Sequence, residues 1–242
     1  NGCATAPDTL TNTVAVDPDL KMGYAETWNV SVQRDLPASL TAMASYLGTR
    51  GHDLLQESLP NTAPPGAPPV CGACPVGFVY VSSTGHSIRH ALTLQLRRRL
   101  RAGFTSSAQY VLASAHDDAT AFGGVGEQAS AIVQDWRNPG ADWGPSAFDQ
   151  RHLLTWSAEY TTGVGIAGGA LRRGLGGTLW RGWILTAQVN AGSGLPLTPH
   201  LLVPVPGTGI AGTIRASTSG ADVSPRAGFL LDRAGYTLPA RG

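Results

Sequence analysis

Hydrophobic and polar residues alternate with a period of two in six segments of the chain. In the first segment, Trp28, Val30 and Val32 share one side, while Thr27, Asn29 and Gln33 share the other. Successive side chains of a strand point to opposite faces, so each segment predicts a strand with one apolar and one polar face. The predicted strands span about residues 24–34, 40–47, 87–100, 104–115, 148–160 and 181–191.

The stretch RHALTLQLRRRLRAGF, residues 89–104, could form either a basic helix or a strand. Leu92, Leu96 and Leu100 are four residues apart, as on a helix. Leu94 interrupts that stripe and makes Leu92, Leu94 and Leu96 a period-two series, which favours a strand. Binding of nucleic acid by a helix here would need the stripe and further basic support, and the formal net charge of the chain is only +1.

The connections between the predicted strands alternate in length. They are short after the first and third strands but long after the second and fourth, at about residues 48–85 and 116–146. One end of the sheet therefore carries tight turns and the other carries large loops, which is typical of outer-membrane barrels. A connection of roughly twenty residues after the fifth strand (TTGVGIAGGALRRGLGGTLW) is the exception on the turn side.

The apolar faces also carry aromatic residues in two bands. Phe104, Tyr160 and Trp183 lie near the turn end, and Trp28, Tyr46 and Tyr110 lie nearer the loop end. Membrane barrels have aromatic girdles of this kind at both interfaces. The opposite faces carry polar residues that suit a wet lumen, namely Thr27, Asn29, Gln33, Thr93, Gln95, Gln109, Thr155, Glu159 and Gln188.

A secreted β-sandwich that binds carbohydrate or a cell surface is the alternative, because its strands alternate equally well. That fold would cover both strand faces and make the aromatic bands part of a core. The membrane interpretation instead predicts that the apolar face points outward.

Composition excludes several other classes of protein. With 242 residues and 42% hydrophobic residues, the chain has the composition of a folded protein. Lys21 is the only lysine, so no Gly-Lys-Ser/Thr phosphate loop can be assembled. No apolar run of about 18 residues predicts a transmembrane helix. The start NGCATAPDTL has neither an initiator Met nor a signal peptide, so we expect a fragment or a processed chain.

Cys71 and Cys74 form a C-G-A-C motif within a proline-rich loop. A redox motif would be expected to open a helix, and a zinc site needs two further ligands. The favoured prediction is a small loop disulfide between Cys71 and Cys74, which suits an exported protein. Free thiols, or metal or redox chemistry, are the alternatives.

Acidic residues and histidines cluster in two short stretches, AHDDA at 115–119 and FDQRH at 148–152. An enzyme or a metal site would require His116, Asp117, Asp118, Asp149 and His152 to converge. Solvated or Arg-paired side chains at loop bases are the more common arrangement, so we expect no metal, no cofactor, no catalytic residue and no enzymatic activity.

Four stretches of the chain resemble strands of TonB-dependent outer-membrane receptors of Gram-negative bacteria, in particular the Oar-like group with a carboxypeptidase-regulatory-like domain. They are YAETWNVSVQRDLPASLTAMASYLGTRGHDL, SIRHALTLQLRRRLRAGFTSSAQYVLASAHDD, FDQRHLLTWSAEY and RGWILTAQVNAGSGLPLTP. The resemblance covers about residues 24–200. Such receptors have about 22 strands and a plug domain, and this chain has about six strands and nothing that resembles a plug or a TonB box.

The resemblance implies an all-β, antiparallel, up-and-down segment from the C-terminal half of a transmembrane barrel in the outer membrane. Residues 1–23 would be an extracellular loop or irregular segment, 24–191 the partial barrel, and 192–242 a Gly/Pro-rich loop or truncated tail. The implied function is energised uptake of a large solute such as a siderophore, an oligosaccharide or a peptide. The implied partners are the rest of the barrel and plug, the TonB complex, outer-membrane lipid and the solute, but no nucleic acid.

On the barrel interpretation, two sets of side chains meet the membrane. The predicted lipid-facing residues are Leu92, Leu94, Leu96, Tyr110, Trp156, Tyr160 and Trp183. The predicted basic residues at the periplasmic rim are Arg97, Arg98, Arg99 and Arg101, because arginine at a membrane boundary can extend its charge to lipid phosphate.

Overall fold

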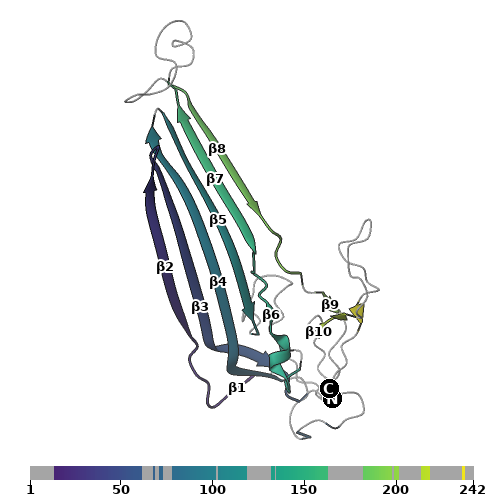
Figure 1. Ribbon diagram of the computed structural model, residues 1–242. Coiled ribbons are helices and arrows are strands. Elements are labelled where there is room, and N and C mark those ends of the chain that lie inside the picture. Colours follow the sequence, from purple (N-terminus) through teal and green to yellow (C-terminus); the bar gives the residue numbers. More distant parts are fainter. Residues whose placement is uncertain are drawn as a thin grey trace, which may run out of the picture.

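Long antiparallel strands form a single layer in the computed structural model of the chain (Figure 1). The structure describes residues 14–61, 68, 71–72, 78–101, 103–118, 132–133, 135–162, 182–197, 199–201, 214–218 and 236–237. The long strands are β2 (Tyr24–Leu36), β3 (Leu40–Ser58), β4 (Val79–Arg101), β5 (Phe104–Asp117), β7 (His152–Thr161) and β8 (Ile184–Gly192). They lie side by side in the order β2-β3-β4-β5-β7-β8, so neighbours in the sheet are also neighbours in the sequence.

Short elements complete the described structure. The main sheet also includes β1 (Val14–Val16), which runs parallel to the start of β4, and β6 (Gly144–Pro145), which pairs with the end of β5. The 3-10 helix η1 (Pro139–Asp142) precedes β6. Two small pairs join β9 (His200–Leu201) to β10 (Ile214–Arg215) and β11 (Ser217–Thr218) to β12 (Tyr236–Thr237). None of the helical structure in the described residues could span a bilayer.

Tight turns join β2 to β3 and β4 to β5 at one end of the sheet, which we call the turn end. Ala38 and Ser39 take positive φ values in the first turn, and Gly103 does so in the second. The opposite, loop end carries the long connections from β3 to β4 and from β5 to β7. The fold class and the asymmetry of the two ends are as the sequence predicts.

The strands differ from the prediction in their lengths. Residues 48–58 and 79–86, expected in a long loop, instead continue β3 and β4. The pairing register shifts between Gly51 and Leu54 and again between Leu54 and Gln56, and Asp53 has a positive φ of 52°. These bulges interrupt the period-two pattern, which is why the pattern ends early in the sequence. Beyond them, β3 and β4 bend sideways beneath β5 and β6 (Figure 1).

The boundaries of other predicted strands also differ from those in the structure. The strand β7 begins at His152 instead of about residue 148, and β8 begins at Ile184 instead of about residue 181. Within the predicted segment 1–23, β1 is a short strand, and most of the predicted tail 192–242 lies outside the described residues.

Candidate functional site

The apolar residues of the long strands lie in register on one face of the sheet. Leu94 lies between Ala44 and Tyr110, and Leu92 lies between Tyr46 and Leu112. Leu154 and Trp156 of β7 continue this face next to β5. We call the surface the apolar face, and it contains Val30, Val32, Ala42, Ala44, Tyr46, Leu92, Leu94, Leu96, Ala108, Tyr110, Leu112, Leu154, Trp156, Tyr160, Leu185 and Val189.

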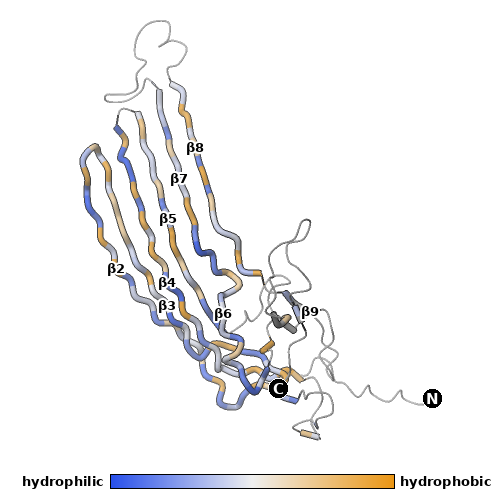
Figure 2. The backbone as a smooth tube through the Cα atoms, turned by 45° about the vertical axis from the view of Figure 1, so that its right-hand side comes forward, coloured by the Kyte–Doolittle hydropathy of each residue, from blue (hydrophilic) through white to orange (hydrophobic). Residues whose placement is uncertain are grey.

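The apolar face is exposed, in contrast to the arrangement in a water-soluble sheet. Leu92, Leu94 and Leu96 are 38%, 44% and 45% exposed, whereas Ala91 on the opposite face is 4% exposed. A soluble antiparallel sheet packs its apolar face on a core and solvates the other. Figure 2 shows hydrophobic and hydrophilic residues alternating along the long strands. The side chains that a β-sandwich would bury are therefore uncovered in the described part of the chain.

Small residues leave a shallow hollow of about 480 Å³ in the middle of the apolar face. Ala42, Ala44 and Ala108 line it together with larger residues such as Val32 and Leu94. The lining is predominantly aliphatic, so it suits a hydrocarbon chain better than a polar ligand.

The opposite face, which we call the polar face, carries amide and hydroxyl side chains in register. One cross-strand row contains Gln33, Met43, Gln95, Gln109, Thr155 and Asn190. A groove of about 450 Å³ lies nearer the turn end, and Ser107, Ser157 and Thr186 line it with the charged residues Arg97 and Glu159. The polar residues predicted to share a face do so.

The four predicted rim arginines all lie at the turn end of β4, where the alternation of side chains along the strand places Arg97 and Arg98 on opposite faces. Arg97 pairs with Thr41 and Ser107 and lines the groove of the polar face. The guanidinium of Arg98 lies over the ring of Phe104 at 5.1 Å, and that of Arg99 is 3.2 Å from the carboxylate of Asp35. Arg101 pairs with Phe104 next to the turn.

Aromatic residues mark both ends of the apolar face. At the turn end, Phe104 pairs with Tyr160, and Trp183 lies just before β8, hydrogen-bonded through its backbone to Thr162. At the loop end, the Trp28 ring lies so close to Gly48 that it would overlap a Cβ atom at that position. An aromatic ring that covers a strand glycine in this way supports the pairing of an edge strand.

Histidines form a band at the loop end that the pattern of hydrophobic and polar residues does not predict. The Tyr46 hydroxyl is 2.7 Å from Nδ1 of His90, and the Tyr110 hydroxyl is 2.7 Å from Nδ1 of His152. Each pair joins neighbouring strands, β3 to β4 and β5 to β7. No local motif in the sequence indicates these contacts, because the partners are more than forty residues apart.

Two further histidines stack on aromatic rings in the same region. His52 stacks on Tyr24 with ring centroids 4.9 Å apart, and His116 stacks on Trp143 at 6.3 Å. We call His52, His90, His116 and His152, with their ring partners, the histidine belt.

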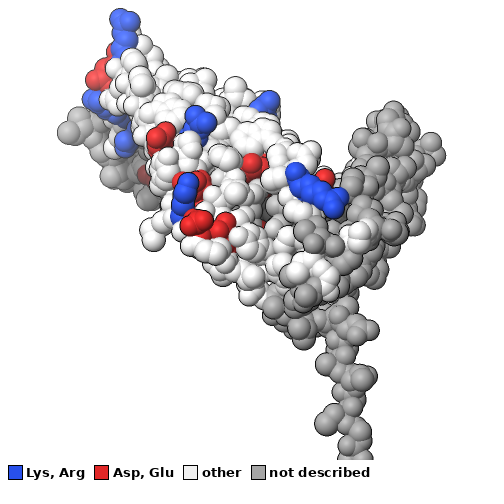
Figure 3. All heavy atoms as spheres, turned by 90° about the horizontal axis from the view of Figure 1, so that it is seen from below, with Lys and Arg blue, Asp and Glu red and all other residues white. Residues whose placement is uncertain are grey.

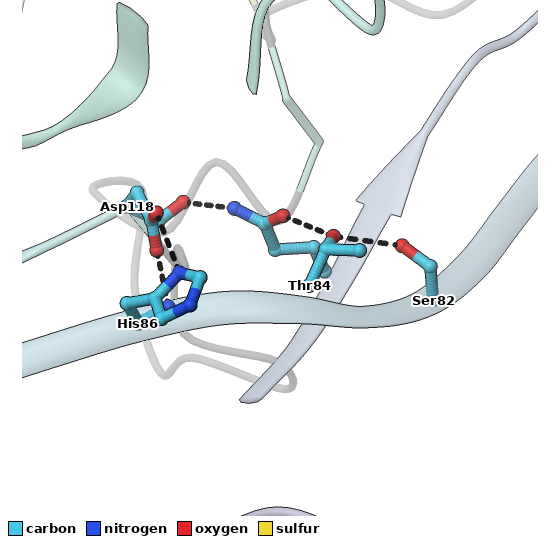
Figure 4. A network of polar contacts seen from close by, with 5 residues as sticks. Ser82, Thr84, His86 and Asp118 are labelled. Carbon is cyan, nitrogen blue, oxygen red and sulfur yellow. Dashed lines mark hydrogen bonds and ion pairs between the residues drawn. The ribbon is translucent and has the colours of Figure 1, made fainter. Parts of the chain in front are cut away.

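A network of polar contacts holds the bent ends of β3 and β4 against the end of β5 (Figure 4). The amide of Gln56, which is 2% exposed, donates to the Asp118 carbonyl and accepts a hydrogen bond from Thr84. The backbone N–H of His86 donates to the Asp118 carboxylate, and Nδ1 of His86 is 3.4 Å from the other carboxylate oxygen. Because buried polar groups are costly unless paired, this network fixes the base of the loop after β5.

The residues around this network form a small core beyond the bend. Leu59, Val81 and Val133 are buried there, and the Val133 N–H donates to the carbonyl of Glu57. Burial raises the pKa of the Glu57 carboxyl.

Seen from the loop end, charged side chains of both signs are interspersed with broad uncharged areas (Figure 3).

The side chains that a metal or acid/base site would bring together instead take separate partners. Asp149 accepts a hydrogen bond from the Ala115 N–H, Asp118 pairs with His86, and His152 contacts Tyr110. No three His, Cys, Asp or Glu side chains of the described residues are arranged to hold a metal ion. Cys71 is disulfide-bonded, and Cys3 and Cys74 lie outside the described residues.

A comparison with protein families identifies one match to almost the whole chain. The model of a family described as "Outer membrane beta barrel domain" matches residues 2–242. Comparisons with curated proteins and with solved structures find no match.

Proposed function

Because the chain belongs to the outer membrane beta barrel domain family, we propose that its apolar face contacts lipid and its polar face lines the lumen of a TonB-dependent receptor. The observation that carries this orientation is the exposure of Leu92, Leu94 and Leu96 on a continuous apolar face. In a barrel wall, lipid covers this face, and water fills the polar side.

The lengths and spacing of the bands support this orientation. Ser114 lies ten positions after Phe104 along β5 and pairs with His90 of the belt. At about 3.3 Å per residue and a tilt of about 40°, this segment rises about 25 Å, the height of the apolar band of outer-membrane barrels. β3 and β4 are longer than the roughly ten residues that a crossing needs, so their bent ends project on the loop side.

The two bands also run obliquely across the strands in the same direction. On β3, the belt contains His52. On β7, it contains His152, which lies level with Tyr46 of β3 and is therefore nearer the turn end than His52. From β5 to β8, the turn-end band likewise moves from Phe104 to Trp183. Strands tilted in a membrane produce such parallel displacements of both bands.

The strands β2 and β8 each have one neighbour in the described sheet, so each leaves an edge of unpaired backbone groups. Hydrocarbon does not tolerate open edges. We therefore assign further barrel strands as partners of both edges. The resemblance to TonB-dependent receptors supports a plug domain and the TonB complex as further partners.

The proposed function is energised uptake of a large solute such as a siderophore, an oligosaccharide or a peptide. The long connections at the loop end would capture the solute, and the amide and hydroxyl groups of the polar face would line its route. We assign no catalytic step, metal or cofactor to the chain.

Uptake can be tested in cells that carry or lack the full-length gene. The probes are an iron-loaded hydroxamate siderophore, a maltooligosaccharide and a decapeptide, each with and without a protonophore. We expect uptake of one probe to require both the gene and the proton gradient. Uptake that requires the gene but persists with the protonophore would indicate passive diffusion and contradict the receptor assignment, as would uptake independent of the gene.

A further inference from the structure

We propose that the histidine belt binds the phosphate groups of the glycolipid in the outer leaflet, and that it binds them more strongly at acidic pH. The inference rests on the orientation under Proposed function, since it needs the apolar face in lipid. It goes beyond transport because it assigns a lipid partner to particular side chains.

The central groups are the two tyrosine–histidine pairs. Tyr46 and Tyr110 each place a hydroxyl 2.7 Å from Nδ1 of a histidine on the next strand. When the hydroxyl donates to Nδ1, the proton of the neutral imidazole is on Nε2. Within the described part of the chain, no hydrogen bond engages Nε2 of His90 or His152, so this N–H is available to an acceptor in the surrounding lipid.

The position of the belt selects the headgroup region. His90 and His152 adjoin Leu92 and Leu154 on the apolar face, and both histidines are exposed. The belt is therefore continuous with the surface that contacts acyl chains. By the rise worked out above, it lies at the outer edge of the apolar band, where lipid phosphate begins and hydrocarbon ends.

Protonation converts each pair into a cationic site. Imidazole is the side chain whose charge generally changes between about pH 5 and pH 8. Once protonated, the ring donates from Nδ1 to the tyrosine oxygen and from Nε2 to lipid phosphate, so one proton adds both a charge and a directed hydrogen bond.

Other charged groups lie close to the histidines of the belt and contribute to the electrostatic potential there. On β2, Glu26 is 3.7 Å from Nε2 of His52, and on β3, Arg50 lies on the same face, paired with Glu26. On β4, His86 pairs with Asp118, which follows β5. These carboxylates place negative charge beside His52 and His86, whereas Arg50 adds a permanent positive charge beside the belt.

The experiment compares the full-length protein with its His90→Phe/His152→Phe variant in nanodiscs. One set of discs contains phosphatidylcholine alone, and the other also contains diphosphoryl lipid A. Phenylalanine keeps an aromatic ring at both positions but cannot donate a hydrogen bond. A Leu92→Phe variant is the matched control, because it adds a ring to the same face and leaves both pairs intact.

We expect lipid A to raise the thermal midpoint of the wild type and the control, and to do so more at about pH 5.5 than at about pH 8. The affinity for lipid A should fall by about tenfold or more in the double variant, which loses two charge-assisted hydrogen bonds. Inorganic phosphate without lipid A should leave all three midpoints unchanged, which identifies a lipid headgroup as the ligand.

Equal lipid A responses of the wild type and the double variant would overturn the belt proposal, as would a response that does not change with pH. An equal response to inorganic phosphate would overturn the assignment to lipid. A separate failure, of Leu94→Arg to destabilise the protein as described in the Discussion, would instead overturn the orientation on which Proposed function rests.

Discussion

The sharpest test of the orientation compares one arginine placed on each face of β4. Leu94 and Gln95 are adjacent in the sequence, and their side chains lie on opposite faces of the sheet. Leu94 is on the apolar face, opposite Tyr110, and Gln95 is in the row of amides on the polar face. The variants Leu94→Arg and Gln95→Arg thus place the charge on opposite faces of the sheet but at nearly the same depth in the membrane.

The expected magnitude follows from the position of Leu94 between the two bands. Its partner Tyr110 is six residues from Phe104 on a segment of ten, which places Leu94 near the middle of the apolar band. An arginine that faces lipid at the midplane costs about 2–4 kcal/mol in a membrane barrel. Gln95→Arg would place its charge in a hydrated lumen, and we expect a change within about 0.5 kcal/mol.

The assay is equilibrium unfolding by urea of the full-length protein in phosphatidylcholine vesicles, followed by tryptophan fluorescence. Leu94→Ala is the control for loss of the leucine side chain, and it should cost less than Leu94→Arg. Equal costs for Leu94→Arg and Gln95→Arg, or a larger cost for Gln95→Arg, would refute the assignment of the apolar face to lipid.

Three further predictions concern the loop end. Gly48→Ala should destabilise the protein by about 1–2 kcal/mol in the same urea assay, because the new Cβ displaces the Trp28 ring; the cost should disappear in a Trp28→Ala background, and its persistence there would contradict the clash. Asp118→Ala should increase amide hydrogen exchange of His86 by about tenfold or more, since it removes the acceptor of that N–H; Asp118→Asn retains an acceptor oxygen and should protect the amide, and equal exchange in both variants would exclude the carboxylate as the anchor. The raised pKa of Glu57 implies that its native state binds a proton more readily than the unfolded chain does, so stability should fall as pH rises through the range between the unfolded and native pKa values; Glu57→Gln should remove that part of the pH dependence, and an unchanged pH profile of urea unfolding would show that Glu57 does not contribute.

Several features of the fold follow from the sequence by local physics. Alternation in segments such as residues 87–100 and 104–115 predicts strands, because one face of each strand must be apolar throughout. The order of the strands follows from the short turns at Leu36–Leu40 and Arg101–Phe104, which can join only antiparallel neighbours. The shared face of Leu92, Leu94, Tyr110 and Trp156 was predictable for the same reason.

The tertiary structure decided which distant side chains meet. The bulges beside Asp53 break the alternation, so the continuation of β3 to Ser58 has no period-two signal. Gln56 looks like a surface residue in the sequence, but the bent strand ends bury it against the Asp118 carbonyl.

The sequence by itself therefore determined the strand type, the two faces and the two unlike ends, because each depends on neighbours within a few residues. The histidine belt depended on the tertiary structure. Tyr46 meets His90 only after β3 and β4 have paired in a particular register, and Tyr110 meets His152 only after β5 and β7 have done so. Which residues of two strands lie opposite each other depends on the register of the whole strand pair, with all its backbone hydrogen bonds. The two contacting residues alone therefore do not predict the contact.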